Sequence, residues 1–198
     1  MFITFEGPDG SGKTTQSKLL YKEFLGGGKN VIWTREPGGT DFGVNLRKIL
    51  LEDSRLKLAP EAELFLFAAD RAQHITEIIR PALQEGKIVI CDRYIDSTTA
   101  YQAGGRGFSV ELIERLNRDS TGGLLPDKTF LIDVPVEVGL QRATRQKADK
   151  FEQESSDFHQ KVRATYLELA RGNPRFHIID GTKTKEEIFE EIRLLGVL

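Results

Sequence analysis

The stretch Gly7-Pro8-Asp9-Gly10-Ser11-Gly12-Lys13-Thr14 decides the fold of this chain. It follows the apolar residues 1–5 and precedes a segment with helical periodicity, the context that the pattern G-x-x-x-x-G-K-[ST] requires. The glycines let the backbone curl so that successive N–H groups point at one anion, and the following helix dipole adds to the attraction. Lys13 can reach the outer phosphates of a nucleotide, and the Thr14 hydroxyl is placed to bind Mg²⁺. The sequence therefore predicts a site for a nucleoside triphosphate and magnesium, formed by this loop together with Thr15.

Length and composition bound the other possibilities. A chain of 198 residues, 39% of them hydrophobic, fits a single domain with a substantial core. The net charge of −2 indicates no global affinity for nucleic acid or for an anionic membrane. The single cysteine, Cys91, excludes an intramolecular disulfide and ends an apolar run, which favours a buried thiol over a nucleophile. Because the sequence shows no signal-peptide pattern and no apolar stretch of membrane length, we expect a cytoplasmic protein.

Short β-branched runs alternate with longer amphipathic segments, which predicts an α/β fold with a parallel sheet flanked by helices. Strands are expected near residues 2–6, 30–34, 88–91, 129–133 and 175–179. Helices are expected at residues 13–24, 41–52, 60–85, 96–103, 109–120, 136–146, 152–170 and 184–195. Thr40 or Asp41 is expected to cap the second helix. Pro81 is expected to kink or break the third helix near Arg80.

The polar residues 141–156 have few apolar anchors. Since no interdomain linker is present, we expect one domain over residues 1–198 with a mobile lid at about 141–156. This stretch carries the cations Arg142, Arg145, Lys147 and Lys150. A basic run on a helix is usually a solvated face, but a lid that closes over phosphates also needs such cations. The residues alone leave both interpretations open.

Two further stretches follow predicted strands, where parallel α/β sheets bind their ligands. Residues 34–40 (Thr-Arg-Glu-Pro-Gly-Gly-Thr) include Arg35, whose guanidinium suits phosphate, although a plain turn with an exposed arginine explains them equally well. After the third strand, Asp92 is a candidate for organising magnesium, and Arg93 for bridging two phosphoryl groups. A surface ion pair is the less favoured alternative for Asp92 and Arg93.

Phe67 and Arg71 lie one helical turn apart and share a face. A nucleobase could stack on the aromatic ring while the guanidinium donates to an exocyclic oxygen. Aromatic residues at helical spacing are more often part of a core, and residues 64–66 are also apolar. From the residues alone, the core interpretation is favoured.

Taken in order along the chain, these stretches resemble the thymidylate kinase family, whose members make dTDP from dTMP and ATP. The matching segments cover most of the chain: residues 7–14, residues 34–40, Phe67-x-x-x-Arg71, Asp92-Arg93-Tyr94, Ser97-Thr98-Thr99-Ala100-Tyr101-Gln102, and the arginine-bearing stretch that runs into residues 151–155. The resemblance implies the P-loop nucleoside-monophosphate kinase fold with a five-stranded parallel sheet. It also implies ATP as co-substrate, Mg²⁺, dTMP as acceptor, and a homodimer.

The resemblance further implies roles for single residues. Phe67 would stack on thymine while Arg71 donates to a thymine oxygen, and Thr98 and Gln102 would face the base. Tyr101 would pack against the sugar and disfavour a ribose. The implied substrate-binding residues are Asp9, Arg35, Glu36, Pro37, Phe67, Arg71, Arg93, Ser97, Thr98, Tyr101, Gln102 and Glu152.

The implied catalytic residues are Lys13, Asp92, Arg93, Arg142 and Arg145. Some family members carry a catalytic arginine where this chain has Gly10. The resemblance therefore implies that the lid supplies that arginine here, as Arg142 or Arg145.

Two other functions are compatible with a phosphate loop. One is a kinase for another monophosphate, such as guanylate, adenylate or cytidylate. The other is a nucleotide switch of the GTPase type, which reads guanine through N/T-K-x-D after a strand. The nearest string, residues 146–149 (Gln-Lys-Ala-Asp), begins with Gln and lies in the polar stretch rather than after a strand, which disfavours the switch.

Overall fold

The computed structural model describes residues 1–52, 56–143 and 150–195. Within these ranges five strands form one sheet in the order β2-β3-β1-β4-β5, and every neighbouring pair is parallel. The strands are β1 (Phe2–Glu6), β2 (Val31–Arg35), β3 (Ile88–Asp92), β4 (Lys128–Asp133) and β5 (Phe176–Asp180). Each lies within one residue of its predicted range. The predicted fold class, a five-stranded parallel sheet flanked by helices, is confirmed.

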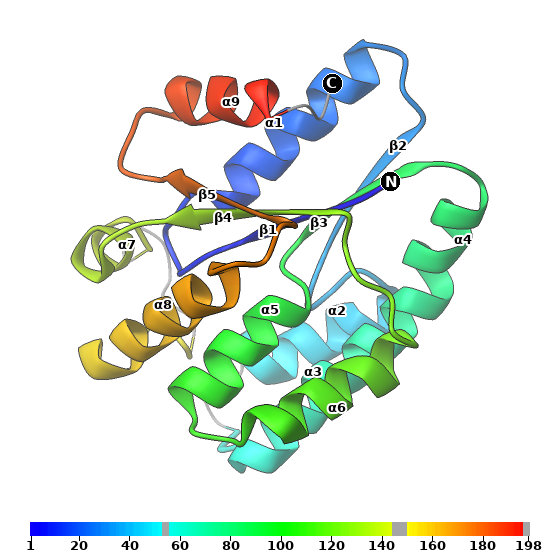
Figure 1. The fold of residues 1–198 in the computed structure, drawn as a ribbon. Coiled ribbons are helices and arrows are strands. Elements are labelled where there is room, and N and C mark those ends of the chain that lie inside the picture. Colours follow the sequence, from blue (N-terminus) through cyan, green and yellow to red (C-terminus); the bar gives the residue numbers. More distant parts are fainter. Residues whose placement is uncertain (53–55, 144–149, 196–198) are drawn as a thin grey trace.

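Helices cover both faces of the sheet (Figure 1). On one face lie α1 (Lys13–Gly26) and α9 (Lys185–Leu194), and on the other lie α3 (Pro60–His74), α6 (Val110–Thr121) and α8 (Ser156–Ala170). The remaining described helices are α2 (Asp41–Arg47), α4 (Arg80–Gln84), α5 (Ile95–Thr98) and α7 (Val136–Ala143). Turns of π-helix continue α2 over Lys48–Glu52, α3 over Ile75–Ile79 and α5 over Thr99–Gly105.

The sheet is buried from both sides. Leu20 and Phe24 of α1 and Ile188 of α9 pack on one face of the central strands. Cys91 lies in the core of the opposite face together with Ile79. Burial raises the pKa of the Cys91 thiol well above its usual value, so the predicted inert, buried thiol is confirmed. Among the described helices, none is long and apolar enough to cross a membrane.

Helix starts and interruptions follow local chemistry. The Thr40 hydroxyl accepts a hydrogen bond from the Gly43 N–H and caps α2. Of the two predicted caps, Thr40 and Asp41, the structure therefore selects Thr40. Near Arg80, where a kink or break was predicted, the chain stays helical but changes type: a π-helical turn ends at Ile79 and α4 follows, with Pro81, which has no N–H, in its first turn.

The start predicted for the helix at residues 152–170 is wrong. The helix α8 begins at Ser156, because the Ser155 hydroxyl accepts from the Phe158 N–H and caps it there. For the helix predicted at 136–146, α7 is described to Ala143, and the rest lies outside the described residues.

Candidate active site

The predicted site residues gather around one cavity of about 560 Å³, next to the loop between β1 and α1. From that loop and the start of α1, the lining residues are Asp9, Gly10, Gly12, Lys13, Thr14 and Thr15. From the rest of the chain, the predicted residues that line the cavity are Arg35, Glu36, Pro37, Phe67, Arg71, Asp92, Arg93, Ser97, Thr98, Tyr101, Gln102, Arg142 and Glu152. Gly7, Pro8 and Ser11 do not line it, and Arg145 lies outside the described residues.

The loop before α1 has the curled backbone that a phosphate site needs. Gly7, Gly10 and Gly12 have φ values of 142°, 70° and 96°, which only glycine adopts easily. Gly12 caps the N-terminus of α1, so the positive end of the helix dipole lies at the loop.

Lys13 is buried at this helix start. Its Nζ donates to the Pro8 carbonyl at 3.0 Å and lies 3.8 Å from Asp9 Oδ1. Burial and then the nearby Arg93 lower the pKa of Lys13 to about 8, against the opposing effect of Asp9, Asp92 and Glu6. A further anion beside Lys13, such as a phosphate group, would therefore stabilise its charged form.

Thr14 and Asp92 form a candidate metal position. The Thr14 hydroxyl donates to Asp92 Oδ2 at 2.5 Å, and Asp92 Oδ1 is buried without a hydrogen-bond partner among the described residues. A hydroxyl beside an unpaired carboxylate oxygen suits Mg²⁺, which keeps several waters and binds few protein groups. The described residues hold no cluster of three or more His, Cys, Asp or Glu that could bind a metal by itself. The oxygen atoms of Thr14 and Asp92 fit an ion that arrives bound to a nucleotide.

Arg93 lies at the centre of a polar cage. Its backbone has the left-handed φ of 71°, which a non-glycine residue rarely adopts. Its Nη2 donates to Asp9 Oδ1 at 2.5 Å and to the Tyr101 hydroxyl at 3.2 Å. Its Nη1 donates to the hydroxyls of Ser97 and Tyr166 at 3.0 and 3.1 Å. A guanidinium held this rigidly at a cavity wall suits a phosphate oxygen.

Asp9 joins Lys13 to Arg93. It pairs with both cations, and its Oδ2 accepts from the Tyr101 hydroxyl at 2.6 Å. Although burial opposes this, the charges of Arg93 and Lys13 hold the pKa of Asp9 below its usual value. The two cations that polyanionic substrates need are therefore kept apart by one ionised carboxylate.

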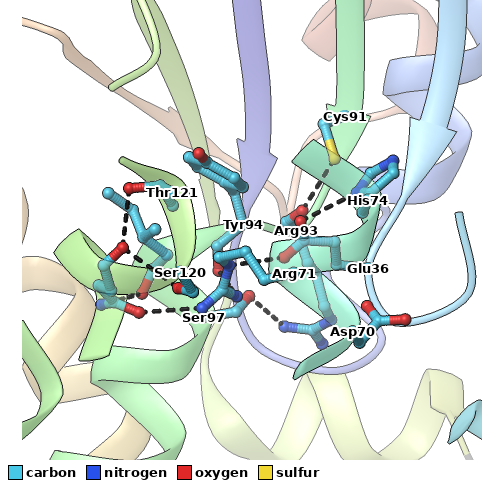
Figure 2. A network of polar contacts seen from close by, with 12 residues as sticks. Glu36, Asp70, Arg71, His74, Cys91, Arg93, Tyr94, Ser97, Ser120 and Thr121 are labelled. Carbon is cyan, nitrogen blue, oxygen red and sulfur yellow. Dashed lines mark hydrogen bonds and ion pairs between the residues drawn. The ribbon is translucent and has the colours of Figure 1, made fainter. Parts of the chain in front are cut away.

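Arg71 belongs to a second buried network (Figure 2). Its Nε donates to Glu36 Oε2 at 2.8 Å, its Nη1 to Asn117 Oδ1 at 2.9 Å and its Nη2 to the Tyr94 carbonyl at 3.1 Å. His74 Nδ1 donates to the other Glu36 oxygen at 2.9 Å. Although burial raises it, the adjacent Arg71 brings the pKa of Glu36 below its usual value. Both oxygens of Glu36 are engaged in holding Arg71 and His74.

Aromatic rings form the wall near Arg71. Phe67 is half-buried and lines the cavity, with its ring centroid 5.9 Å from that of Phe151. The ring of Tyr101 lies edge-on to Phe151 at 5.5 Å. Phe67 packs against a core cluster and faces the cavity, so the core and base-platform interpretations are both compatible with its position.

The helix α7 meets the phosphate loop through two glycines. A Cβ on Gly10 would lie 2.0 Å from the Gly139 carbonyl oxygen, so neither backbone leaves room for a side chain. One turn later Arg142 lines the cavity and its Nη1 donates to the Gly181 carbonyl at 2.8 Å. Lys147 lies outside the described residues. Lys150 donates to the carbonyls of Ile49 and Leu56, at 3.2 and 2.9 Å.

Glu6, Asn117 and Tyr166 are polar residues behind this wall that the sequence analysis did not predict. Glu6 accepts from the Ser97 hydroxyl at 2.5 Å and supports the Arg93 cage from behind. Burial and then Asp96 raise the pKa of Glu6 to about 7. A carboxylate ending an apolar strand was a usable signal for Glu6, whereas Asn117 and Tyr166 look like ordinary helix residues in the sequence.

Comparisons with known proteins agree with this geometry. The sequence model of the thymidylate kinase family matches residues 5–192. The thymidylate kinase of Nitratidesulfovibrio vulgaris is 48% identical, with 97% of this chain and 94% of that protein covered. That of Kosmotoga olearia is 49% identical, with 97% and 93% covered. The crystal structure of thymidylate kinase from Ehrlichia chaffeensis superposes with a TM-score of 0.79 at 40% identity, covering 98% of this chain and 97% of that one. The chain therefore belongs to the thymidylate kinase family, whose enzymes phosphorylate dTMP to dTDP with ATP.

Proposed function

We propose that this chain performs γ-phosphoryl transfer from ATP to dTMP inside the cavity described above, with ATP phosphates on residues 7–15 and the dTMP phosphate on Arg93. The observation that carries the proposal is the Lys13–Asp9–Arg93 arrangement, in which the buried Lys13 and the partly buried Arg93 flank one carboxylate at the cavity wall. One cation serves each nucleotide. The geometry supports two polyanions that meet end to end.

This reaction needs no general base. The second pKa of a phosphate ester is about 6, so the acceptor phosphate is mostly dianionic at neutral pH. The obstacle is charge repulsion and alignment, so the catalytic groups neutralise and position. We assign this work to Lys13, Arg93 and a lid arginine, either Arg142 or Arg145.

Mg²⁺ would be held on the nucleotide side by Thr14, with Asp92 beside it. When bound, the ion would neutralise charge on the β- and γ-phosphoryl oxygens. Asp92 orients the Thr14 hydroxyl through the hydrogen bond between them. Arg93, held in its cage, would then face the acceptor side.

The acceptor nucleoside would lie along the aromatic wall. We propose that thymine stacks on Phe67, receives a hydrogen bond from Arg71 and contacts Thr98 and Gln102. Tyr101 would meet the sugar at C2′, with Glu152 nearby. Arg35, Pro37 and Ser97 would complete the contacts to the phosphate and base, while Glu36 would act by holding Arg71.

Three further proposals concern the whole chain. Residues 1–198 would act as one domain, with a lid at about residues 141–156, of which 144–149 lie outside the described part. The protein would form a homodimer, which the exposed apolar side chains on α2, α3 and α6 support. It would act in the cytoplasm, with which the buried free thiol of Cys91 is compatible.

An acceptor panel tests the proposed function. ADP release from ATP is measured with dTMP, dGMP, AMP or CMP as the acceptor, and the product of the dTMP reaction is identified as dTDP. We expect dTMP to be strongly preferred. A preference for another monophosphate would indicate a different kinase, and ATP turnover that ignored every monophosphate would indicate a nucleotide switch.

A further inference from the structure

The side-chain amide of Gln102 has one end hydrogen-bonded and the other end without a partner in the described part of the chain. The residue lies in the π-helical turn after α5, is fully buried and lines the cavity. Its Nε2 donates to Glu63 Oε1 at 3.0 Å. Its Oε1 is buried and has no hydrogen-bond partner within the described part of the chain. A buried acceptor without a hydrogen bond destabilises the folded protein, so Gln102 Oε1 is suited to accept a hydrogen bond from a ligand in the cavity.

Glu63 decides which end of that amide faces which way. An ionised carboxylate only accepts hydrogen bonds, so the amide NH₂ of Gln102 must point at Glu63 and the carbonyl oxygen must point away. Glu63 itself is buried in the first turn of α3. Arg106 holds it with a two-point pair, Nε to Oε1 at 3.1 Å and Nη2 to Oε2 at 3.2 Å.

Arg106 is in turn fixed from the other side. Its Nη1 donates to Glu154 Oε1 at 2.6 Å, and its guanidinium lies over the rings of Phe151 and Phe158 at 5.3 and 5.1 Å. Because Arg106 is held by these three residues, Glu63 cannot easily turn away. The orientation of the Gln102 amide is therefore built into the folded chain rather than chosen by the substrate.

We propose that Glu63 is a positioning residue that sets base specificity by holding Gln102 Oε1 as a hydrogen-bond acceptor toward the base. This inference rests on the proposed function, in which Gln102 faces the base. Thymine and uracil carry a hydrogen on ring N3 and can donate to Gln102. Cytosine has an unprotonated N3, which would bring two acceptors together and leave both unpaired. A site built this way admits 4-oxopyrimidines and rejects 4-aminopyrimidines.

The variant Glu63→Gln tests this inference. The new amide can donate to Gln102 Oε1, which lets the Gln102 amide turn its NH₂ toward the base. We expect kcat/KM for dTMP to fall, kcat/KM for dCMP to rise, and their ratio to change by at least about tenfold. The ratio of dUMP to dTMP should stay at the wild-type value, because uracil and thymine present the same N3–H.

Glu154→Gln is the matched control. It makes the same change of carboxylate to amide on the other partner of Arg106 without touching Gln102, so we expect its dCMP-to-dTMP ratio to match the wild type. A second check is the double variant Glu63→Gln/Gln102→Leu. If Glu63 acts through Gln102, adding Glu63→Gln to Gln102→Leu should leave the ratio unchanged.

The outcomes separate this inference from the proposed function. A wild-type protein that does not phosphorylate dTMP would overturn the proposed function. A wild type active on dTMP, with a folded Glu63→Gln variant whose dCMP-to-dTMP ratio is unchanged, would overturn the role of Glu63 alone. Should Glu63→Gln fail to fold, Glu63→Asp carries the same test, since its shorter side chain withdraws the acceptor from Gln102. An unchanged ratio there would also overturn the inference.

Discussion

At the scale of single residues, Lys13 shows how its surroundings set its chemistry. Burial and Arg93 bring its pKa to about 8, so part of the ligand-free protein has a neutral Lys13 at mildly alkaline pH. A triphosphate favours the charged form of this side chain. Protonation of Lys13 and binding of ATP are therefore linked, and each should strengthen the other.

The pH dependence of ATP affinity follows from this linkage. The affinity should fall as the pH rises above about 8, because Lys13 must then take up a proton on binding. Calorimetric titration of ATP from about pH 7 to about pH 9.5 measures it. Lys13→Arg is the control, since its guanidinium stays charged and should remove this dependence. If the ATP affinity of both proteins depends on pH to the same extent, the titrating group is not Lys13.

Tyr101 offers a second test at this scale, on the choice of sugar. Its ring is buried beside the cavity and its hydroxyl is held by Asp9, so the ring can exclude a 2′-hydroxyl by its bulk. Tyr101→Ala should raise the kcat/KM of ribothymidine monophosphate relative to dTMP by at least about tenfold. Tyr101→Phe keeps the ring and should keep the discrimination. If both variants discriminate as the wild type does, the ring has no role in sugar choice.

At the scale of elements, α7 and the phosphate loop meet as two bare backbones. A Cβ on Gly139 would lie 2.6 Å from the Asp9 carbonyl oxygen, and one on Gly10 would meet Gly139. An arginine in place of Gly10 would have no space in this chain. This contact is consistent with a catalytic arginine that comes from Arg142 or Arg145 on or after α7.

Gly139→Ala should therefore disturb catalysis from outside the cavity. The added methyl group would push α7 away from the loop and move Arg142, lowering kcat by at least about tenfold while the KM for dTMP changes less. Steady-state kinetics measure the split. Gly26→Ala is the control, because Gly26 ends α1 with nothing within 4 Å of an added Cβ. Normal turnover of Gly139→Ala would mean that the contact between α7 and the loop does not position the arginine.

Elements of strong local pattern were predictable from the sequence, and others were not. Strands such as β1 and β3 are short apolar runs buried on both sides, so their limits could be read directly. The start of α8 was missed because the capping hydroxyl of Ser155 outweighs the helical periodicity that begins at residue 152. The π-helical turns have no sequence pattern that distinguishes them from α-helix.

The site was predictable where motifs have fixed spacing. The phosphate loop, Asp92 and Arg93 follow strands, and parallel strands bring their carboxyl ends together. The supporting residues could not be found in this way. Glu63 and Asn117 reach the site from helices that are distant in sequence, so only the fold shows that they hold Gln102 and Arg71.

At the scale of the whole molecule, several exposed apolar side chains lie on three neighbouring helices. Phe42 and Val44 on α2, Phe65 on α3, and Val110 on α6 are all exposed, and these helices pack against one another. The helix α9 lies on the opposite face of the sheet (Figure 1). Such side chains on neighbouring helices fit the homodimer that the family resemblance implies.

The oligomeric state can be tested by sedimentation. The wild type should sediment with twice the mass of one chain, and Phe65→Glu should shift it toward the monomer, because Phe65 is 55% exposed and would bring a charge into an apolar contact. Leu194→Glu on α9 is the control; Leu194 is 85% exposed, and the dimer should persist. A monomeric wild type would contradict the homodimer.

The most direct test of the account concerns the charge at the phosphate loop. The rate of dTDP formation from ATP and dTMP is compared between the wild type and Lys13→Ala at saturating concentrations of both nucleotides. Because Lys13 is the buried cation on the ATP side, its loss should lower this rate by at least about 10²-fold. A folded Lys13→Ala protein that forms dTDP at the wild-type rate would contradict the proposed role of Lys13 in phosphoryl transfer.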